Sequence, residues 1–130
     1  MISAARKTLL ICDDEKDLAE ELGEYFSETG WRVNICNSGR EAERLLFEGL
    51  APECLLTDLR LGDMDGSRLV AMAHALPALI RPRLMVVMTG NILGSATKHT
   101  LGVDILRLKP VDPVMLAQEM EDMLLSRMTD

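Results

Sequence analysis

The chain has 130 residues, of which 48% are hydrophobic and 27% are charged, and these values are typical of one globular domain, here residues 1–130. Its formal net charge of −7 at pH 7 disfavours direct nucleic-acid binding, which usually requires a basic face. No apolar run approaches the roughly 18 residues of a membrane span, and the N-terminal residues lack a signal-peptide pattern, so we expect a cytoplasmic protein without membrane contact.

The first part of the chain alternates strand and helix patterns. Residues 8–12 form an apolar run too short for a helix, which predicts a strand buried on both faces. Residues 16–29 carry apolar residues at helical spacing, and residues 31–36 alternate with a period of two, as a half-buried strand does. Ser38 then caps a helix that ends near Gly49.

The same alternation continues through the second part of the chain. Residues 53–58 predict a third strand, a loop of turn-forming residues follows at 59–66, and residues 67–76 predict a helix. Residues 83–90 are the most strand-like stretch in the chain. Two glycines bracket residues 91–102 and leave room for at most a short helix there.

A last strand and helix complete the pattern. Residues 104–109 predict a fifth strand, and Pro113 begins the final helix. The residues expected to face inward from this helix are Val114, Leu116, Met120, Met123 and Leu124. Strictly alternating elements with apolar central strands predict an α/β fold with a parallel sheet and helices on both of its faces.

Polar residues lie where four of the predicted strands end: Asp13 and Asp14, Asp58, Thr89, and Lys109. Any one of them fits a solvated strand end, but the carboxyl ends of parallel strands lie along one edge of a sheet, where ligands bind. Three neighbouring carboxylates raise one another's pKa unless a cation neutralises them, and Mg²⁺ prefers such oxygen ligands. The threonine and the lysine then suit the oxygens of a phosphoryl group, with one carboxylate as the nucleophile.

These motifs resemble the receiver domain of two-component response regulators over nearly the whole chain. The resemblance lies in the paired acids after the first strand, the stretch DLRLGDMDG from Asp58, the Thr-Gly pair at residue 89 and the Lys-Pro pair at residue 109. It implies a flavodoxin-like, doubly wound sheet of five parallel strands in the order 2-1-3-4-5, with helices on both faces. It also implies a signalling switch rather than a dedicated enzyme.

The resemblance implies a role for each acidic residue. Asp58 matches the position that receives a phosphoryl group from a phosphohistidine on a histidine kinase or a histidine phosphotransfer protein. Asp14 matches a direct Mg²⁺ ligand, and Asp13 matches a residue that reaches the metal through water. Asp58 and the backbone carbonyl of Arg60 complete the implied metal site.

Two further residues are implied to contact the phosphoryl group. Thr89 would bond a phosphoryl oxygen and shift on activation, and Lys109 would pair with the group. The Lys109–Pro110 peptide bond is cis in the family, which aims the lysine inward, although only a few per cent of X–Pro bonds in proteins are cis. These residues do not specify an output partner.

Three features depart from the family pattern. Gly62 stands where proline is common, Leu106 stands where tyrosine or phenylalanine is usual, and the stretch from Thr89 to Lys109 is shorter than in common relatives. Gly94 weakens any helix in that stretch further. We therefore expect a more mobile loop at Gly62 and an unusual output surface beside the fifth strand.

Two other functions fit the same residues less well. A Mg²⁺-dependent phosphohydrolase with an aspartyl nucleophile would carry DxDx[TV] after its first strand, and the stretch CDDEK lacks it. An interaction module that is never phosphorylated would be favoured if site residues were missing, and none is. Since no output segment follows residue 130, we expect the chain to act through partners, to serve as a phosphorelay intermediate, or to be part of a longer protein.

The other notable residues fit structural roles. Three cysteines without CxxC spacing are expected to be buried, reduced thiols: Cys12, Cys36 and Cys54. His74 and His99 lack metal-ligand spacing, and we expect the first in a helix and the second on the surface. Trp31 opens the second strand, so we expect it at the edge of the sheet opposite the acidic residues.

Overall fold

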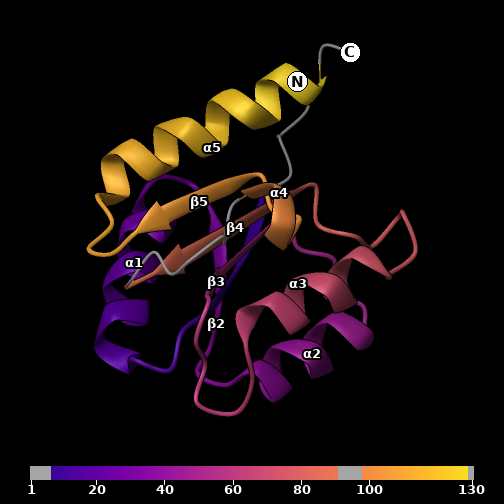
Figure 1. Ribbon diagram of the computed structural model, residues 1–130. Coiled ribbons are helices and arrows are strands. Elements are labelled where there is room, and N and C mark those ends of the chain that lie inside the picture. The colour runs from indigo at the N-terminus through magenta and orange to yellow at the C-terminus, as the bar shows by residue number, and fades with distance from the viewer. Residues whose placement is uncertain (1–6, 91–97, 129–130) are drawn as a thin grey trace.

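The computed structural model describes residues 7–90 and 98–128, in which strands and helices alternate along the chain (Figure 1). The strands are β1 Thr8–Cys12, β2 Arg32–Cys36, β3 Cys54–Asp58, β4 Leu84–Thr89 and β5 Ile105–Leu108. The helices are α1 Lys16–Glu28, α2 Gly39–Phe47, α3 Gly66–His74, α4 Lys98–Leu101 and α5 Pro113–Met128. The predicted strands and helices are confirmed, with small differences at their ends.

The five strands form one parallel sheet in the order β2-β1-β3-β4-β5. Helices α1 and α5 pack on one face, and α2 and α3 lie side by side on the other (Figure 1). This arrangement confirms the predicted doubly wound fold and its strand order. Because β1 and β3 are neighbours, with Cys12 paired to Thr57, the residues that follow these strands meet at one edge of the sheet.

The sheet separates two apolar cores. The core under α1 and α5 contains Leu9, Ile11, Phe26, Leu116 and Met120, among others. The core under α2 and α3 contains Leu10, Leu46, Leu55, Leu69 and Val87, among others. Every residue of β3 and β4 is buried, because helices cover both faces of the sheet there.

One residue that we predicted to face inward from α5 does not. Val114 is 60% exposed, whereas Leu116, Met120 and Leu124 are buried and Met123 packs partly against the same core. The buried residues recur every four positions and therefore lie along one side of the helix. Val114 precedes Leu116 by two positions, which turns its side chain about 200° away from that side.

The segment that we expected to be weakly helical contributes one short helix to the described structure. Helix α4 has four residues, Lys98–Leu101, and none of its described side chains is buried. Gly94 and the rest of residues 91–97 lie outside the described residues.

Trp31 lies directly before β2, at the amino end of the strands, and so at the edge of the sheet opposite Asp13. Its side chain is only 2% exposed and meets the ring of Phe26 edge to face, with the ring centroids 6.1 Å apart. The Nζ atom of Lys7 lies 5.0 Å from the centroid of the indole ring, within the range of a cation–π contact. This position is the one predicted from the sequence.

The cysteines and histidines also lie where we expected them. The three cysteines are free and buried. Burial raises the pKa of the Cys12 and Cys36 thiols to about 12 and raises the pKa of Cys54 well above its ordinary value. His74 is the last residue of α3, and His99 is exposed in α4.

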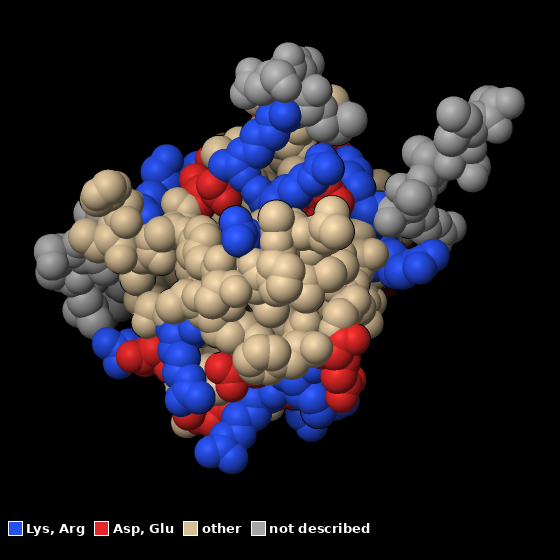
Figure 2. Space-filling model, turned by 90° about the vertical axis from the view of Figure 1, so that its right-hand side faces the viewer, with Lys and Arg blue, Asp and Glu red and all other residues tan. Residues whose placement is uncertain are grey.

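The side of the molecule that lies to the right in Figure 1 presents a broad uncharged surface with charged side chains around it (Figure 2). The turn after α3 extends toward this side, and its residue Leu79 is 97% exposed. Phe47, the last residue of α2, is 70% exposed.

Among residues 7–90 and 98–128, no helix combines the length and the apolar character of a membrane span.

Candidate functional site

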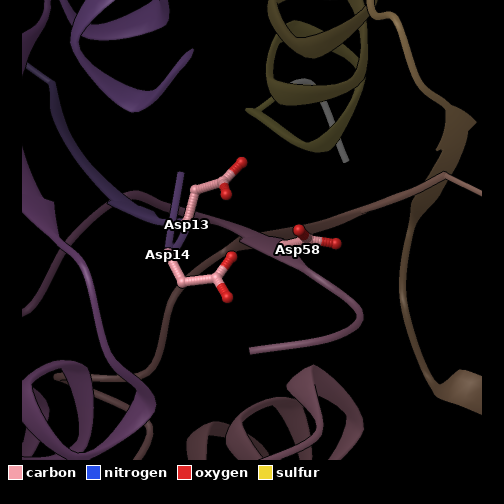
Figure 3. A group of neighbouring side chains, drawn as sticks. All are labelled: Asp13, Asp14 and Asp58. Carbon is pink, nitrogen blue, oxygen red and sulfur yellow. The ribbon is translucent and has the colours of Figure 1, made fainter. Parts of the chain in front are cut away.

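Three carboxylates converge at the carboxyl ends of β1 and β3 (Figure 3). Asp13 and Asp14 directly follow β1, and Asp58 is the last residue of β3. One carboxylate oxygen from each lies within 4.8 Å of the other two. The pairing of β1 with β3 therefore brings together side chains that are 45 positions apart, as the strand-end pattern predicted.

Asp13 is the most deeply placed of the three, with a fully buried side chain. Its Oδ1 atom accepts a hydrogen bond from the backbone N–H of Glu15 at 2.9 Å, and its Oδ2 atom accepts one from Lys109 Nζ at 3.0 Å. The side chain of Asn37 donates to the backbone carbonyl of Asp13 at 3.0 Å. These contacts compensate a buried charge that would otherwise strongly destabilise the fold.

Lys109 supplies the positive charge of the site. Its Nζ atom donates to Asp58 Oδ2 at 2.9 Å and to Asp13 Oδ2 at 3.0 Å, and it lies 3.4 Å from Glu15 Oε1. Burial by itself lowers the pKa of this ammonium, but hydrogen bonds and charges from Asp58 and Asp13 outweigh it, so the pKa is raised above its ordinary value. The backbone N–H of Lys109 donates to the carbonyl of Thr89 at 2.7 Å, and the following peptide bond to Pro110 is cis, as expected.

The loop after β3 approaches Asp58 closely. Asp58 Oδ1 accepts a hydrogen bond from the backbone N–H of Arg60 at 3.3 Å, and the N–H of Gly66 donates to the carbonyl of Leu59 at 2.6 Å. A Cβ atom at Gly66 would lie 2.2 Å from the backbone oxygen of Asp58, so only glycine fits there. The loop can therefore return to the start of α3 directly beside the end of β3.

A pocket of about 610 Å³ opens above these side chains. It is lined by Asp14, Glu15, Asp58, Arg60, Thr89, Gly90 and Lys109. Each predicted site residue thus lines this pocket, except Asp13, which lies buried beneath it. Glu15 and Gly90 were not predicted; the only signal for them in the sequence is that each directly follows a predicted site residue.

The charges around this pocket fit a divalent cation. Asp14, Glu15 and Asp58 line the pocket together with the basic residues Arg60 and Lys109, and the buried Asp13 lies next to Lys109, so acidic residues outnumber basic ones by four to two. Carboxylate oxygens are the ligands that Mg²⁺ prefers, and it commonly takes one or two of them and keeps several waters. Asp14 is exposed and lines the pocket, so its carboxylate is accessible to an incoming ion.

Comparison with known sequences points to one family. The profile of the response regulator receiver domain matches residues 9–121. The transcriptional regulatory protein GlrR of Escherichia coli (strain K12) is 31% identical over 117 residues, which are 89% of this chain and 26% of that protein. The response regulator receiver protein Anae109_2439 of Anaeromyxobacter sp. (strain Fw109-5) is 32% identical over 101 residues, which are 78% of this chain and 41% of that protein. The chain therefore spans less than half the length of these relatives.

Solved structures share the same fold. A CheY-like response regulator receiver domain protein from Methanospirillum hungatei JF-1 superposes with a TM-score of 0.83 at 22% identity, and the match covers 96% of this chain and 98% of that one. A two-component response regulator from Clostridium difficile gives a TM-score of 0.81 at 21% identity, with 96% and 100% covered. At these identities the similarity concerns the fold alone.

Proposed function

The chain belongs to the response regulator receiver domain family, and on that basis we propose that it is a phosphoacceptor switch of two-component signalling, with Asp58 as the phosphorylated residue. The observation that carries this proposal is the position of Asp58 at the base of an acidic pocket, with Lys109 Nζ 2.9 Å from one of its carboxylate oxygens. Asp58 is 7% exposed, so the pocket limits access to it without closing it off.

In the proposed reaction, a phosphohistidine on a histidine kinase or a histidine phosphotransfer protein is the donor. A carboxylate oxygen of Asp58 attacks the phosphorus atom, and the bond between phosphorus and the imidazole nitrogen breaks. That nitrogen keeps the bonding electron pair, and Asp58 becomes an acyl phosphate. Water later hydrolyses the acyl phosphate, so the chain returns to its starting state without a dedicated catalytic domain.

A bound Mg²⁺ would supply positive charge next to the phosphoryl oxygens. Asp13, Asp14, Asp58 and the backbone carbonyl of Arg60 are the residues that we assign to this ion. The convergence of three carboxylate oxygens within 4.8 Å supports that assignment. Without a cation, the negative charge of these carboxylates would repel an anionic phosphoryl group.

Lys109 and Thr89 are the residues that we assign to the phosphoryl group itself. Lys109 Nζ already donates to Asp58 Oδ2, so a short displacement would transfer that hydrogen bond to a phosphoryl oxygen. Thr89 ends β4 and lines the same pocket, from which its hydroxyl would donate to a second phosphoryl oxygen. These two groups would hold the transferred group after the donor leaves.

The proposed switch acts in the cytoplasm through protein partners. Its input partner is a protein that carries phosphohistidine, and its output partner is a protein that distinguishes the phosphorylated surface from the unphosphorylated one. The excess of acidic residues disfavours direct contact with nucleic acid or with an anionic membrane surface.

Labelling by acetyl phosphate tests the proposal. Intact-mass analysis of the wild type should show one added phosphoryl group in the presence of Mg²⁺ and none after addition of a chelator. Asp58→Asn should stay unlabelled, and Asp65→Asn, which alters another aspartate of the same loop, should be labelled like the wild type. Equal labelling of Asp58→Asn and the wild type would contradict the assignment of Asp58.

A further inference from the structure

Asp63 joins the loop after Asp58 to the first turn of α2. Its Oδ1 atom accepts a hydrogen bond from the backbone N–H of Gly39 at 2.9 Å, and its Oδ2 atom accepts one from the N–H of Arg40 at 3.0 Å. These N–H groups belong to the start of the helix and have no partner within it, and a negative charge is favourable there. Both hydrogen bonds hold the pKa of Asp63 below its ordinary value.

Met64 makes a second contact between the same two segments. A Cβ atom at Gly39 would lie 2.4 Å from both Cγ and Sδ of Met64, so the side chain of Met64 packs directly on the helix backbone. Gly39 is buried by this contact. The side chains of two successive loop residues therefore both contact the start of α2.

Gly62 lies within the same loop and gives its backbone additional freedom. Glycine has the greatest backbone freedom of any residue, whereas proline would hold φ near one value. The φ angle of Gly62 lies outside the left-handed region, and within residues 7–90 and 98–128 an added Cβ atom would meet only Asp14 Oδ2, at an ordinary 3.6 Å. Nothing in this geometry requires glycine at position 62. One hydrogen bond within the loop spans it, from the N–H of Leu61 to the carbonyl of Met64 at 3.0 Å. The contacts with α2 are a second restraint, which acts from outside the loop.

We propose that Asp63 is a positioning residue: its bridge to α2 holds the loop that carries Arg60 in place and supplies the restraint that Gly62 lacks. Arg60 lies three positions before Asp63, and its backbone N–H donates to the Asp58 carboxylate. With the bridge intact, the Asp58 carboxylate and the backbone of Arg60 are ordered before a cation or a phosphoryl group arrives, which lowers the entropy lost on binding. This inference rests on the proposed function for its effect on phosphorylation, but not for its effect on the loop.

The test compares four versions of the 130-residue chain: the wild type, Asp63→Ala, Gly62→Pro/Asp63→Ala and Asp65→Ala. Asp65 is the matched control, because it lies in the same loop and its side chain makes no capping hydrogen bond. Amide hydrogen exchange without metal measures the order of residues 59–65, calorimetry measures Mg²⁺ affinity, urea unfolding measures stability, and acetyl phosphate measures the phosphorylation rate.

We expect Asp63→Ala to speed hydrogen exchange in residues 59–65 and to weaken Mg²⁺ binding by up to about 10-fold. This is the low end of the effect of losing a residue that hydrogen-bonds directly to a metal ligand, because Asp63 acts on the site through the loop backbone. The proline in Gly62→Pro/Asp63→Ala should restore most of the affinity, and Asp65→Ala should match the wild type. If Asp63→Ala folds poorly, Asp63→Asn keeps one acceptor oxygen and should show a smaller loss of the same kind.

Two results would overturn the inference. One is that Asp63→Ala or Asp63→Asn loses stability while its Mg²⁺ affinity and the hydrogen exchange of its loop stay unchanged. Asp63 would then act only as a cap of helix α2. The other is a double variant whose Mg²⁺ affinity stays as low as that of Asp63→Ala. Failure of the proposed function is a separate result. If the wild type is not phosphorylated, hydrogen exchange and Mg²⁺ binding can still be compared between the wild type and Asp63→Ala.

Discussion

The ammonium nitrogen of Lys109 lies 2.9 Å from the Asp58 carboxylate, although 51 positions separate the two residues along the chain. The same nitrogen donates to Asp13, whose side chain is fully buried. Before any cation binds, Lys109 is therefore the cationic side chain that contacts both of these carboxylates. Its removal should affect the stability of the fold and the binding of Mg²⁺ in different ways.

Lys109→Ala should destabilise the metal-free protein by roughly 3 kcal/mol, because it leaves buried carboxylates without their charged partner. That value is at the low end of the usual range, since the lysine side chain remains 13% exposed. Mg²⁺ binding should be retained, because we assign the lysine to the phosphoryl group and not to the metal. Urea unfolding and calorimetry measure the two effects, with Lys16→Ala, on the exposed first turn of α1, as the control. A lost Mg²⁺ affinity would mean that Lys109 belongs to the metal site.

Gly66→Ala should disturb the site through the backbone. The new Cβ atom would lie 2.2 Å from the Asp58 carbonyl oxygen and 3.1 Å from Leu59 Cα, so either the loop or the start of α3 must move. We expect a loss of about 1–3 kcal/mol in the free energy of unfolding and a slower reaction with acetyl phosphate. Gly90→Ala is the matched control, because a Cβ atom there has no neighbour within 4 Å among the residues that the structure describes, although Gly90 lines the same pocket. Equal behaviour of the two variants would show that the close approach at Gly66 is unimportant.

The bridge between Asp63 and α2 should depend on pH. The hydrogen bonds from Gly39 and Arg40 hold the pKa of Asp63 below 3.8, so its contribution to stability is present above that value and is lost as pH falls through the lowered pKa. The difference in free energy of unfolding between the wild type and Asp63→Asn should be constant from pH 8 to about pH 5 and should shrink below about pH 4. Urea unfolding across this range measures it, with Asp65→Asn as the charge-matched control. A difference that does not vary with pH would contradict a charged bridge.

Leu106 should confine the response to phosphorylation. Its side chain packs against the core under α2 and α3, and it pairs with Val87 of β4. It has no aromatic ring, although tyrosine or phenylalanine is usual at this position in the family. A ligand shifts an equilibrium only by its different affinity for two states, and without a ring these states should differ less along β5. We therefore expect beryllofluoride to change amide chemical shifts mainly at residues 58–66, 89–90 and 98–102. Shifts along β5 and residues 113–125 should be smaller.

Leu106→Tyr provides the comparison for that experiment, because it restores an aromatic ring at this position. Its shift changes should extend further along β5 and α5 than those of the wild type. The confinement hypothesis is falsified if the largest wild-type shifts run through Leu106 and residues 113–125.

Local patterns in the sequence predicted the elements of this fold and the convergence of its acidic residues. Apolar runs such as residues 8–12 and 83–90 predicted strands because burial on both faces acts on each residue locally. The strand-end rule then placed Asp13, Asp14 and Asp58 on one edge, since parallel strands all end on the same side of a sheet. The helical pattern was less accurate at Val114, because an apolar residue at the start of a helix does not reveal which way it faces.

The contacts between these residues could be read from the three-dimensional arrangement alone. The hydrogen bonds of Lys109, the closeness of Gly66 to the Asp58 carbonyl and the bridge from Asp63 to Gly39 each join segments that come together only after the sheet has formed. None of these contacts has a local signature, because a glycine or an aspartate in a loop has the same letter whether it faces solvent or another backbone. The composition and period of a segment report its burial, whereas the distance between two segments depends on strand register and helix packing, which the whole chain sets together.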